Sequence, residues 1–250
     1  MALADTNSDY TVSFLDGYEE IITALKDGAI DGALLPARYV GELTEDEYTV
    51  IAVTAYMSLT AIENGGSITS IYDLDDKPIV IPDSVQSAPE MQMLSVLLSH
   101  AGISPDLTFE PEDTVWQRVQ DGNFEIMILP AEQCAPVLAY SVKYRSCFKL
   151  ASQWNALIGA QPPAGGCIIV RSACIEEKRD AIYDFLAALE NSIRFLTTHR
   201  NKSATAIVLN GLGDDIDYIR GTISHCMFVY LDGEYMDESI RQLSMLTQIQ

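Results

Sequence analysis

The chain has 250 residues, of which 48% are apolar, so it is long enough for one large domain or two small ones. Its 15 basic and 36 acidic residues give a formal net charge of −21 at pH 7, and a surface this negative repels the phosphate backbone of nucleic acids. No low-complexity segment interrupts the chain, which argues against disorder.

The first predicted elements alternate between strand and helix. β-forming residues alternate over Tyr10–Leu15 and predict a strand. An apolar stripe that ends at Leu25 predicts a helix, Ile30–Leu35 a buried strand, and Pro36 the start of another helix.

Part of this region occurs twice in the sequence. Leu25–Ala37 (LKDGAIDGALLPA) aligns without a gap with Val119–Ala131 (VQDGNFEIMILPA), at a constant offset of 94 residues. In each copy a helix runs into Asp-Gly, where glycine adopts the left-handed conformation that ends a helix. An acidic residue follows, Asp31 or Glu125, and then a buried strand that stops at Leu-Pro-Ala. We therefore expect one such unit in each half and interpret the two acids as turn or cap residues rather than a catalytic pair.

The next segment leads to a second lobe. Tyr48–Ile62 is too long for one ordinary strand and predicts a bend near Ala55–Ser58. The cluster Asn64–Ser67 is the clearest linker-like segment. We therefore expect a discontinuous lobe I (residues 1–63 and 155–250) and a lobe II (residues 64–154).

Lobe II opens with a strand, a loop and a helix. The short strand Ile79–Ile81 precedes the polar loop Pro82–Pro89, in which Ser87 is the candidate N-cap of the helix Glu90–His100. The loop serines and free backbone N–H groups at a helix start are what an anion-binding site requires, although a plain N-cap fits the same residues equally well.

The remaining elements continue the alternation. A strand, a helix and a strand are predicted at Leu107–Phe109, Thr114–Gln120 and Phe124–Leu129. Cys147–Leu157 is expected to return to lobe I.

The C-terminal part adds the strand Cys167–Val170, a long helix from Ile175 to His199 and a last helix from about Asp237. This alternation is typical of the α/β class with largely parallel sheets.

The sequence lacks the common motifs of nucleotide and acyl-transfer sites. There is no G-x-G-x-x-G, G-x-x-x-x-G-K-[ST] or G-x-S-x-G, and the three histidines have no metal-ligand spacing, so we expect no cofactor or metal. Five cysteines without a C-x-x-C pair favour buried thiols, with a Cys167–Cys226 disulfide as the alternative in an oxidising compartment. The first ten residues show no signal-peptide pattern, and no stretch is apolar enough to span a membrane.

Two long stretches carry a family resemblance. GYEEIITALKDGAIDGALLPA and SIYDLDDKPIVIPDSVQSAPEMQMLSVLLSHAGI resemble solute-binding proteins of ABC importers. The nearest group is the nitrate/sulfonate/taurine-type family, which is related to the thiamine-pyrimidine-precursor proteins. Later segments around Trp154, Gly166–Arg171 and Cys226–Tyr230 are similar to a lipoprotein branch of that group.

The resemblance implies a two-lobed type 2 periplasmic-binding fold of α/β class that closes on a small anionic or heteroaromatic solute. Two departures from the family concern the chain's ends. No counterpart of the family's first βα unit precedes Tyr10, which would weaken solute binding, and the chain ends soon after the helix containing Leu243. The ligand-facing positions implied by the resemblance are Pro36, Ala37, Ser58, Ser84, Gln86, Ser87, Pro130, Glu132 and Trp154.

The resemblance further implies a monomer that works with ABC permease subunits, is located outside the cytoplasm and is tethered to membrane lipid in its full-length form. Two alternatives stay open. One is an enzyme on the same fold, related to chorismate dehydratase or to pyrimidine-precursor synthesis. The other is the effector domain of a transcription regulator. If the protein is a solute-binding protein, we expect Pro36 and Pro130 to lie on opposite walls of one cleft.

Overall fold

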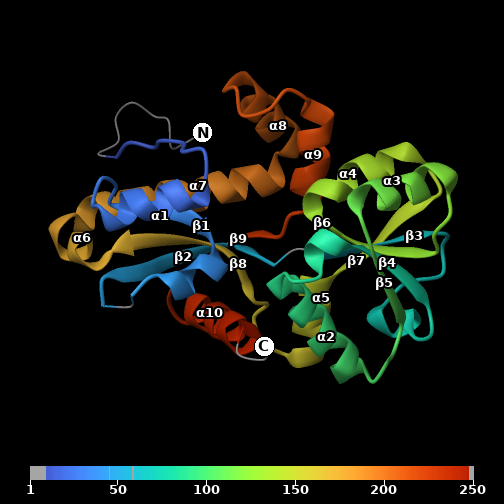
Figure 1. Ribbon diagram of the computed structural model, residues 1–250. Coiled ribbons are helices and arrows are strands. Elements are labelled where there is room, and N and C mark those ends of the chain that lie inside the picture. The colour runs from blue at the N-terminus through green and yellow to red at the C-terminus, as the bar shows by residue number, and fades with distance from the viewer. Residues whose placement is uncertain (1–9, 45, 58, 248–250) are drawn as a thin grey trace.

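The computed structural model describes residues 10–44, 46–57 and 59–247. Its strands form two sheets that lie side by side, with helices packed on both faces of each (Figure 1). We call the four-stranded sheet A and the five-stranded sheet B, and the units built on them lobe I and lobe II. The α/β class is confirmed.

Sheet A is antiparallel throughout. In spatial order its strands are β1 (Gly32–Pro36), β8 (Ala164–Arg171), β2 (Tyr48–Tyr56) and β9 (Phe228–Leu231). The helices of this lobe are α1 (Tyr18–Lys26), the 3-10 helix η2 (Ala37–Glu42), α6 (Ser172–Glu177), α7 (Arg179–Thr198) and α10 (Gly233–Thr247).

Sheet B mixes parallel and antiparallel pairs. Its strands in order are β5 (Asp106–Glu110), β4 (Pro78–Pro82), β6 (Ile126–Pro130), β3 (Leu59–Asn64) and β7 (Tyr144–Lys149), with β4 parallel to both of its neighbours. Its helices are the 3-10 helices η3 (Ile71–Leu74) and η4 (Asp83–Val85), and α2 (Pro89–Ala101), α3 (Glu112–Asp121), α4 (Ala131–Tyr140) and α5 (Leu150–Ile158).

The expectation of largely parallel sheets is wrong for sheet A. In each lobe one strand enters from the other lobe, β8 between β1 and β2, and β3 between β6 and β7. Both inserted strands run antiparallel to their neighbours. The alternation of strands and helices along the sequence carries no information about the direction of such a strand, so it could not reveal this arrangement.

The internal repeat is confirmed as a pair of equivalent units. Gly28 and Gly122 both have left-handed φ angles, 72° and 64°, at the ends of α1 and α3. Leu34 and Ile128 occupy equivalent strand positions, yet Leu34 is 58% exposed and Ile128 is fully buried. The reason is that β6 pairs with β4, whereas β1 lies at an edge of sheet A and has no counterpart of β4 and β5 among the described residues.

Three local predictions differ from the structure. Residues Tyr10–Leu15 form no strand and are largely exposed, because alternation alone gives a segment no partner edge. The long helix expected from Ile175 to His199 is divided at Lys178 into α6 and α7. The α2 helix begins at Pro89 with Ala88 as its N-cap, so Ser87 is not the capping residue.

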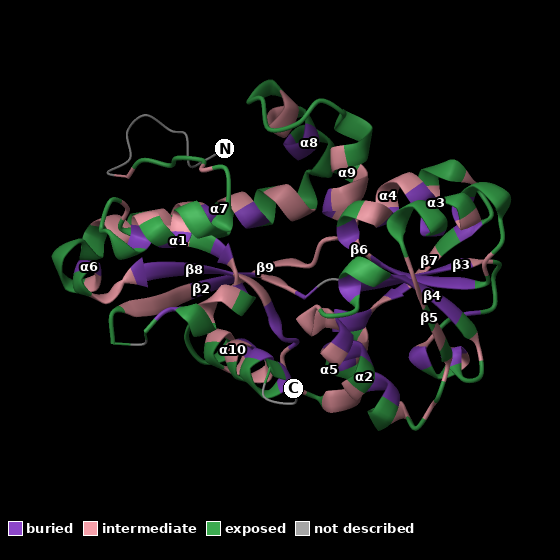
Figure 2. Cartoon of the chain, viewed as in Figure 1, coloured by how far each residue is buried: buried purple, intermediate pink, exposed green. Residues whose placement is uncertain are grey.

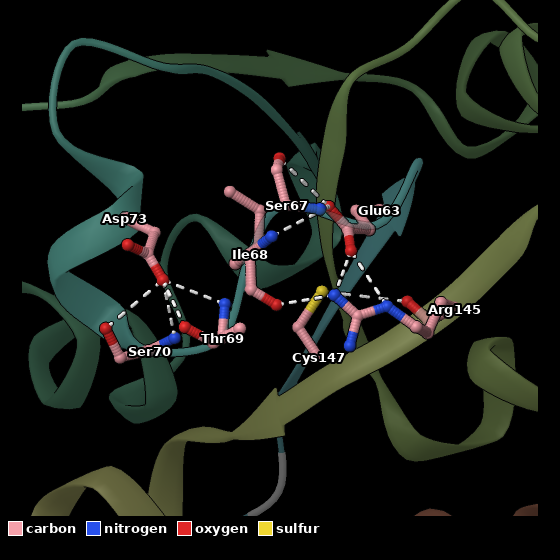
Figure 3. Close-up of polar contacts among 8 residues, drawn as sticks. All are labelled: Glu63, Ser67, Ile68, Thr69, Ser70, Asp73, Arg145 and Cys147. Carbon is pink, nitrogen blue, oxygen red and sulfur yellow. Dashed lines mark hydrogen bonds and ion pairs between the residues drawn. The ribbon is translucent and has the colours of Figure 1, made fainter.

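The predicted linker Asn64–Ser67 is instead a turn within lobe II that hydrogen bonds hold in place (Figure 3). The buried carboxylate of Glu63 accepts hydrogen bonds from the backbone N–H groups of Ser67 and Ile68, each at 3.0 Å. It also accepts one from Arg145 Nε at 2.9 Å. The chain instead leaves sheet A between Tyr56 and Leu59, within the bend predicted near Ala55–Ser58. Because β3 belongs to sheet B, we propose a first lobe boundary near residue 57 rather than 63.

Apolar packing is continuous between the lobes. One buried cluster includes Leu35 and Val53 from sheet A, Met57 from the crossing segment, and Ile79 and Ile81 from sheet B. Strand β8 of sheet A and the inner strands β4, β6 and β3 of sheet B are correspondingly buried, β2 is buried in part, and the outward helix faces are exposed (Figure 2). None of the helices in the described part of the chain is long and apolar enough to cross a membrane.

Helices also connect the two lobes. After α7 the chain forms α8 (Arg200–Leu209) and α9 (Ile216–His225), and α9 packs against α4 of lobe II before β9 returns to sheet A. On another side, α10 contacts α2. The lobes are therefore held together by two pairs of helices as well as by the crossing segments.

Candidate functional site

The register of sheet B places several strand ends at one edge. Pro130 at the end of β6 lies beside Leu59 at the start of β3, and Thr60 lies beside Lys149 at the end of β7. Because β4 is parallel to β6, Pro82 and the loop that follows it are at the same edge. This edge is the one at which the chain arrives from lobe I.

Sheet A presents a corresponding edge. Pro36 lies beside Gly166, and Tyr56 at the end of β2 lies beside Ala164 at the start of β8. The crossing segments are joined here, because the Met57 N–H donates to the Pro163 carbonyl at 3.0 Å. The two Leu-Pro-Ala turns therefore stand at the two sheet edges that the crossing segments connect.

The loop after β4 contains three of the expected ligand-facing residues. Gln86 and Ser87 are exposed, and the Ser84 hydroxyl donates to Glu112 Oε1 at 3.0 Å. The side chain of Gln133 donates to the same oxygen at 3.0 Å. Glu112, which sequence reasoning did not single out, thus links this loop to the first turn of α4.

The turn after β6 combines an exposed acid with a buried thiol. Glu132 is exposed in the first turn of α4, and Pro130 is half-buried. The Cys134 thiol donates to the Pro130 carbonyl at 3.2 Å. Burial raises the pKa of Cys134 to about 12, so this sulfur is a neutral packing group rather than a nucleophile.

Two of the expected positions are not at an open surface. Trp154 on α5 is only 3% exposed and packs in the core cluster, where its Nε1 has no hydrogen-bond partner among the described residues. Ala37 is also buried, and it lines a cavity of about 350 Å³ formed by lobe I alone. Ser58 lies outside the described residues.

Lys149 adds a positive charge at the sheet B edge. Its half-buried Nζ donates to the Ser224 carbonyl in the last turn of α9 at 2.7 Å. Burial lowers the pKa of Lys149, and the nearby charge of Arg200 lowers it further. Burial and the charges of Lys149 and Arg200 also lower the pKa of His225. The only indication of the role of Lys149 in the sequence is its position at the end of a stretch of β-forming residues.

The two repeated acids are structural. Asp31 pairs with Lys178 at 2.6 Å and with Arg171 at 3.0 Å, and Glu125 pairs with Lys77 at 2.5 Å. Both acids precede their strands, so they lie at the opposite ends of the strands from the two proline turns. The expected turn role fits these contacts.

The cysteines and the other titratable groups form no redox or metal centre in the described part of the chain. All five cysteines are free thiols, so the alternative of a Cys167–Cys226 disulfide is not realised. Within the same residues, no group of three His, Cys, Asp or Glu side chains is placed to hold a metal ion.

Comparison with known proteins identifies the fold. No protein-family model matches the sequence, and neither does any curated protein. The structure is similar to that of an ABC transporter from Parabacteroides distasonis, with a TM-score of 0.70 at 14% identity over 96% of this chain and 81% of that one.

Two further solved structures are also similar. The periplasmic aliphatic sulphonate binding protein SsuA from Escherichia coli gives a TM-score of 0.64 at 14% identity, over 92% of this chain and 74% of that one. The ligand-binding component of an ABC-type import system from Staphylococcus aureus, with zinc bound, gives 0.60 at 13% identity, over 99% and 84%.

These similarities place the chain in one class of fold. It has the two-lobed α/β architecture of the solute-binding components of ABC importers. The expected two-lobed periplasmic-binding fold is confirmed. At identities of 13–14% the likeness concerns the fold, and the solute is a separate question.

Proposed function

We propose that this protein is the solute-binding component of an ABC importer, and that it closes its two lobes on a small anionic or heteroaromatic solute. The observation that carries the proposal is the position of the strand ends. Pro36 in sheet A and Pro130 in sheet B both end strands at the edges where the chain crosses between lobes. In open α/β sheets ligands bind beyond the carboxyl ends of strands, so the junction is the expected place for a solute.

The proposed lining is the set of turns at these two edges. Pro36 comes from lobe I, while Ser84, Gln86, Ser87, Pro130 and Glu132 come from lobe II, with Ser58 near the first crossing. The expected positions Ala37 and Trp154 are buried and are not counted in this lining. The exposed side chains of Gln86 and Ser87 supply hydrogen-bond donors and acceptors.

An anionic solute is favoured by Lys149. In a chain with a net charge of −21, a half-buried lysine at the sheet B edge provides the local positive charge that an anion requires. Closure would be a hinge motion about the crossing segments, in which solute contacts from both lobes stabilise the closed form.

Partners and location follow from the same proposal. The protein delivers its solute to ABC permease subunits as a monomer, outside the cytoplasm, and is tethered to membrane lipid.

A thermal-shift screen against sulfonates, nitrate, pyrimidines and amino acids tests the proposal. A solute present at 100 times its Kd should raise the free energy of unfolding by roughly 2.7 kcal/mol. Lys149→Gln should weaken an anionic hit about tenfold or more, whereas Lys202→Gln, which changes an exposed lysine on α8, should leave the hit unchanged.

Two results would count against the proposal. One is a screen in which no compound stabilises the wild-type protein. The other is chemical turnover of a hit, which would show that the protein is an enzyme with the same fold.

A further inference from the structure

Lobe I contains a cavity that is separate from the junction. Its volume is about 350 Å³, and it lies between η2, strands β2 and β8, and helix α10. Polar and apolar surface line it in comparable amounts, and the larger aliphatic side chains of the lining are Val40, Leu43, Val50, Ile169, Ile240 and Leu243. Sites for small organic ligands have about this volume or more, and they combine apolar side chains with a few polar groups that orient the ligand.

The polar part of the lining contains a cation. Arg38 and the hydroxyl-bearing residues Tyr48, Ser244 and Thr247 also line the cavity. The guanidinium of Arg38 lies 4.9 Å from the centre of the Tyr39 ring and forms no ion pair with any described residue. Arg38 is exposed, and in a chain with 36 acidic and 15 basic residues its guanidinium provides a local positive charge beside the aliphatic side chains of the cavity.

The hydroxyl groups complete the polar end. Ser244 donates to the Ile240 carbonyl at 3.1 Å, and Thr247 donates to the Ser244 carbonyl at 3.1 Å. Their protons are therefore used within α10, which leaves the charged guanidinium of Arg38 and the neutral hydroxyl of Tyr48 as donors at this cavity. A guanidinium binds a planar carboxylate through two parallel hydrogen bonds.

We propose that this cavity is a second binding site, which takes a medium-chain aliphatic carboxylate with its carboxylate on Arg38 and its hydrocarbon chain among the aliphatic residues of η2, β2, β8 and α10. The ligand differs from the proposed solute by its aliphatic chain, for which the cavity offers six larger aliphatic side chains, and every lining residue belongs to lobe I. The site therefore does not depend on closure of the lobes.

Calorimetric titration of the whole protein with octanoate tests the site. We expect saturable binding with one site, and hexanoate should bind about 15-fold more weakly, since each buried methylene contributes roughly a factor of four. Arg38→Gln should weaken octanoate at least tenfold. The matched control is Arg241→Gln, an exposed arginine on α10 outside the cavity lining, which should bind as the wild type does.

A second variant tests the apolar part. Gly41 lines the cavity, and a Cβ atom at this position meets nothing within 4 Å, so a side chain can be added here and Gly41→Leu is expected to narrow the cavity. It should reduce octanoate binding, whereas Gly66→Leu, at an equally open position in lobe II, should not.

Three results would overturn the proposal. They are the absence of saturable octanoate binding, equal losses in Arg38→Gln and Arg241→Gln, and binding that is insensitive to Gly41→Leu.

Discussion

At the scale of single residues, Glu63 has a buried and extensively hydrogen-bonded carboxylate in lobe II. It is 2% exposed and holds the turn that follows β3 through two backbone N–H groups and Arg145 (Figure 3). Burial raises the pKa of Glu63, but the hydrogen bonds from Ile68, Arg145 and Ser67 outweigh it, so the pKa lies below its usual value. The hydrogen bonds of this turn therefore stabilise the ionised form of the Glu63 carboxylate.

Replacing this carboxylate should therefore be costly. Glu63→Gln removes the charge and leaves Arg145 with a weaker partner, so we expect the free energy of unfolding to fall by about 2–4 kcal/mol in urea denaturation. The control is Glu125→Gln, because the Glu125–Lys77 pair is roughly 40% exposed on both sides and should contribute less than about 1 kcal/mol. Equal effects of the two substitutions would contradict the role assigned to Glu63.

The dependence of stability on pH follows from the same kind of contact. Hydrogen bonds from the N–H and hydroxyl of Thr69 and from the N–H of Ser70 lower the pKa of Asp73 to about 2, and the pKa values of Asp31 and Glu63 are also lowered. The unfolded chain therefore binds protons at a higher pH than the folded chain. Stability should be full above about pH 5 and should fall progressively as the pH decreases toward about 2.

The variant Asp73→Asn isolates one part of this loss. Its stability should change less between pH 4 and pH 2 than that of the wild type, as measured by urea denaturation at each pH. Parallel curves for the two proteins over this range would show that Asp73 does not contribute as described.

At the scale of secondary-structure elements, the contact between α9 and α4 attaches the C-terminal segment of lobe I to lobe II. A Cβ atom at Gly221 would lie 2.6 Å from the Cβ of Ala135, which is closer than real Cβ contacts come. The two helices therefore approach as closely as they do because residue 221 has no side chain. Lys149, which bonds the last turn of α9, fixes the same contact from β7.

Gly221→Ala should separate these helices and lower the free energy of unfolding by about 1–3 kcal/mol, even though alanine is the better helix former. Ala135→Gly removes the opposing Cβ, so the double variant should be more stable than the sum of the single effects predicts. Strict additivity in this double-mutant cycle, measured by chemical denaturation, would mean that the two positions do not touch.

The same scale shows what could be predicted from the sequence. The two Asp-Gly…Leu-Pro-Ala units were predictable because their information is local, namely a helix-ending glycine, an apolar run and a proline stop. Tyr10–Leu15 carried an equally regular pattern and forms no strand, since a strand also needs a neighbouring edge that periodicity does not supply. The antiparallel insertion of β3 and β8 depends on chain crossings that no local pattern records.

The candidate site was predictable only in part, for related reasons. Turns at strand ends, such as those at Pro36 and Pro130, follow from element boundaries. Glu112 and Lys149 reach the same region through tertiary packing from a helix and a strand that are distant in sequence. The linker assignment at Asn64–Ser67 failed because a buried side chain, that of Glu63, orders a segment whose composition is typical of flexible loops.

At the scale of the whole molecule, the two lobes are already in extensive contact. An apolar cluster runs from sheet A to sheet B, and α9–α4 and α10–α2 contacts join the lobes. A solute-driven motion would therefore be a small rearrangement around the crossing segments, with the helix contacts acting as the second constraint on the hinge.

Hydrogen exchange measured by mass spectrometry, with and without a compound that raises the melting temperature, tests the central claim most directly. Binding at the junction predicts slower exchange at the edges of both sheets at once, in residues 82–88 and 130–133 of lobe II and residues 35–38 of lobe I. Slower exchange confined to lobe I, around η2 and α10, would place the compound in the second cavity instead. That result, or the absence of protection in lobe II, would contradict the claim that the two lobes close on a solute.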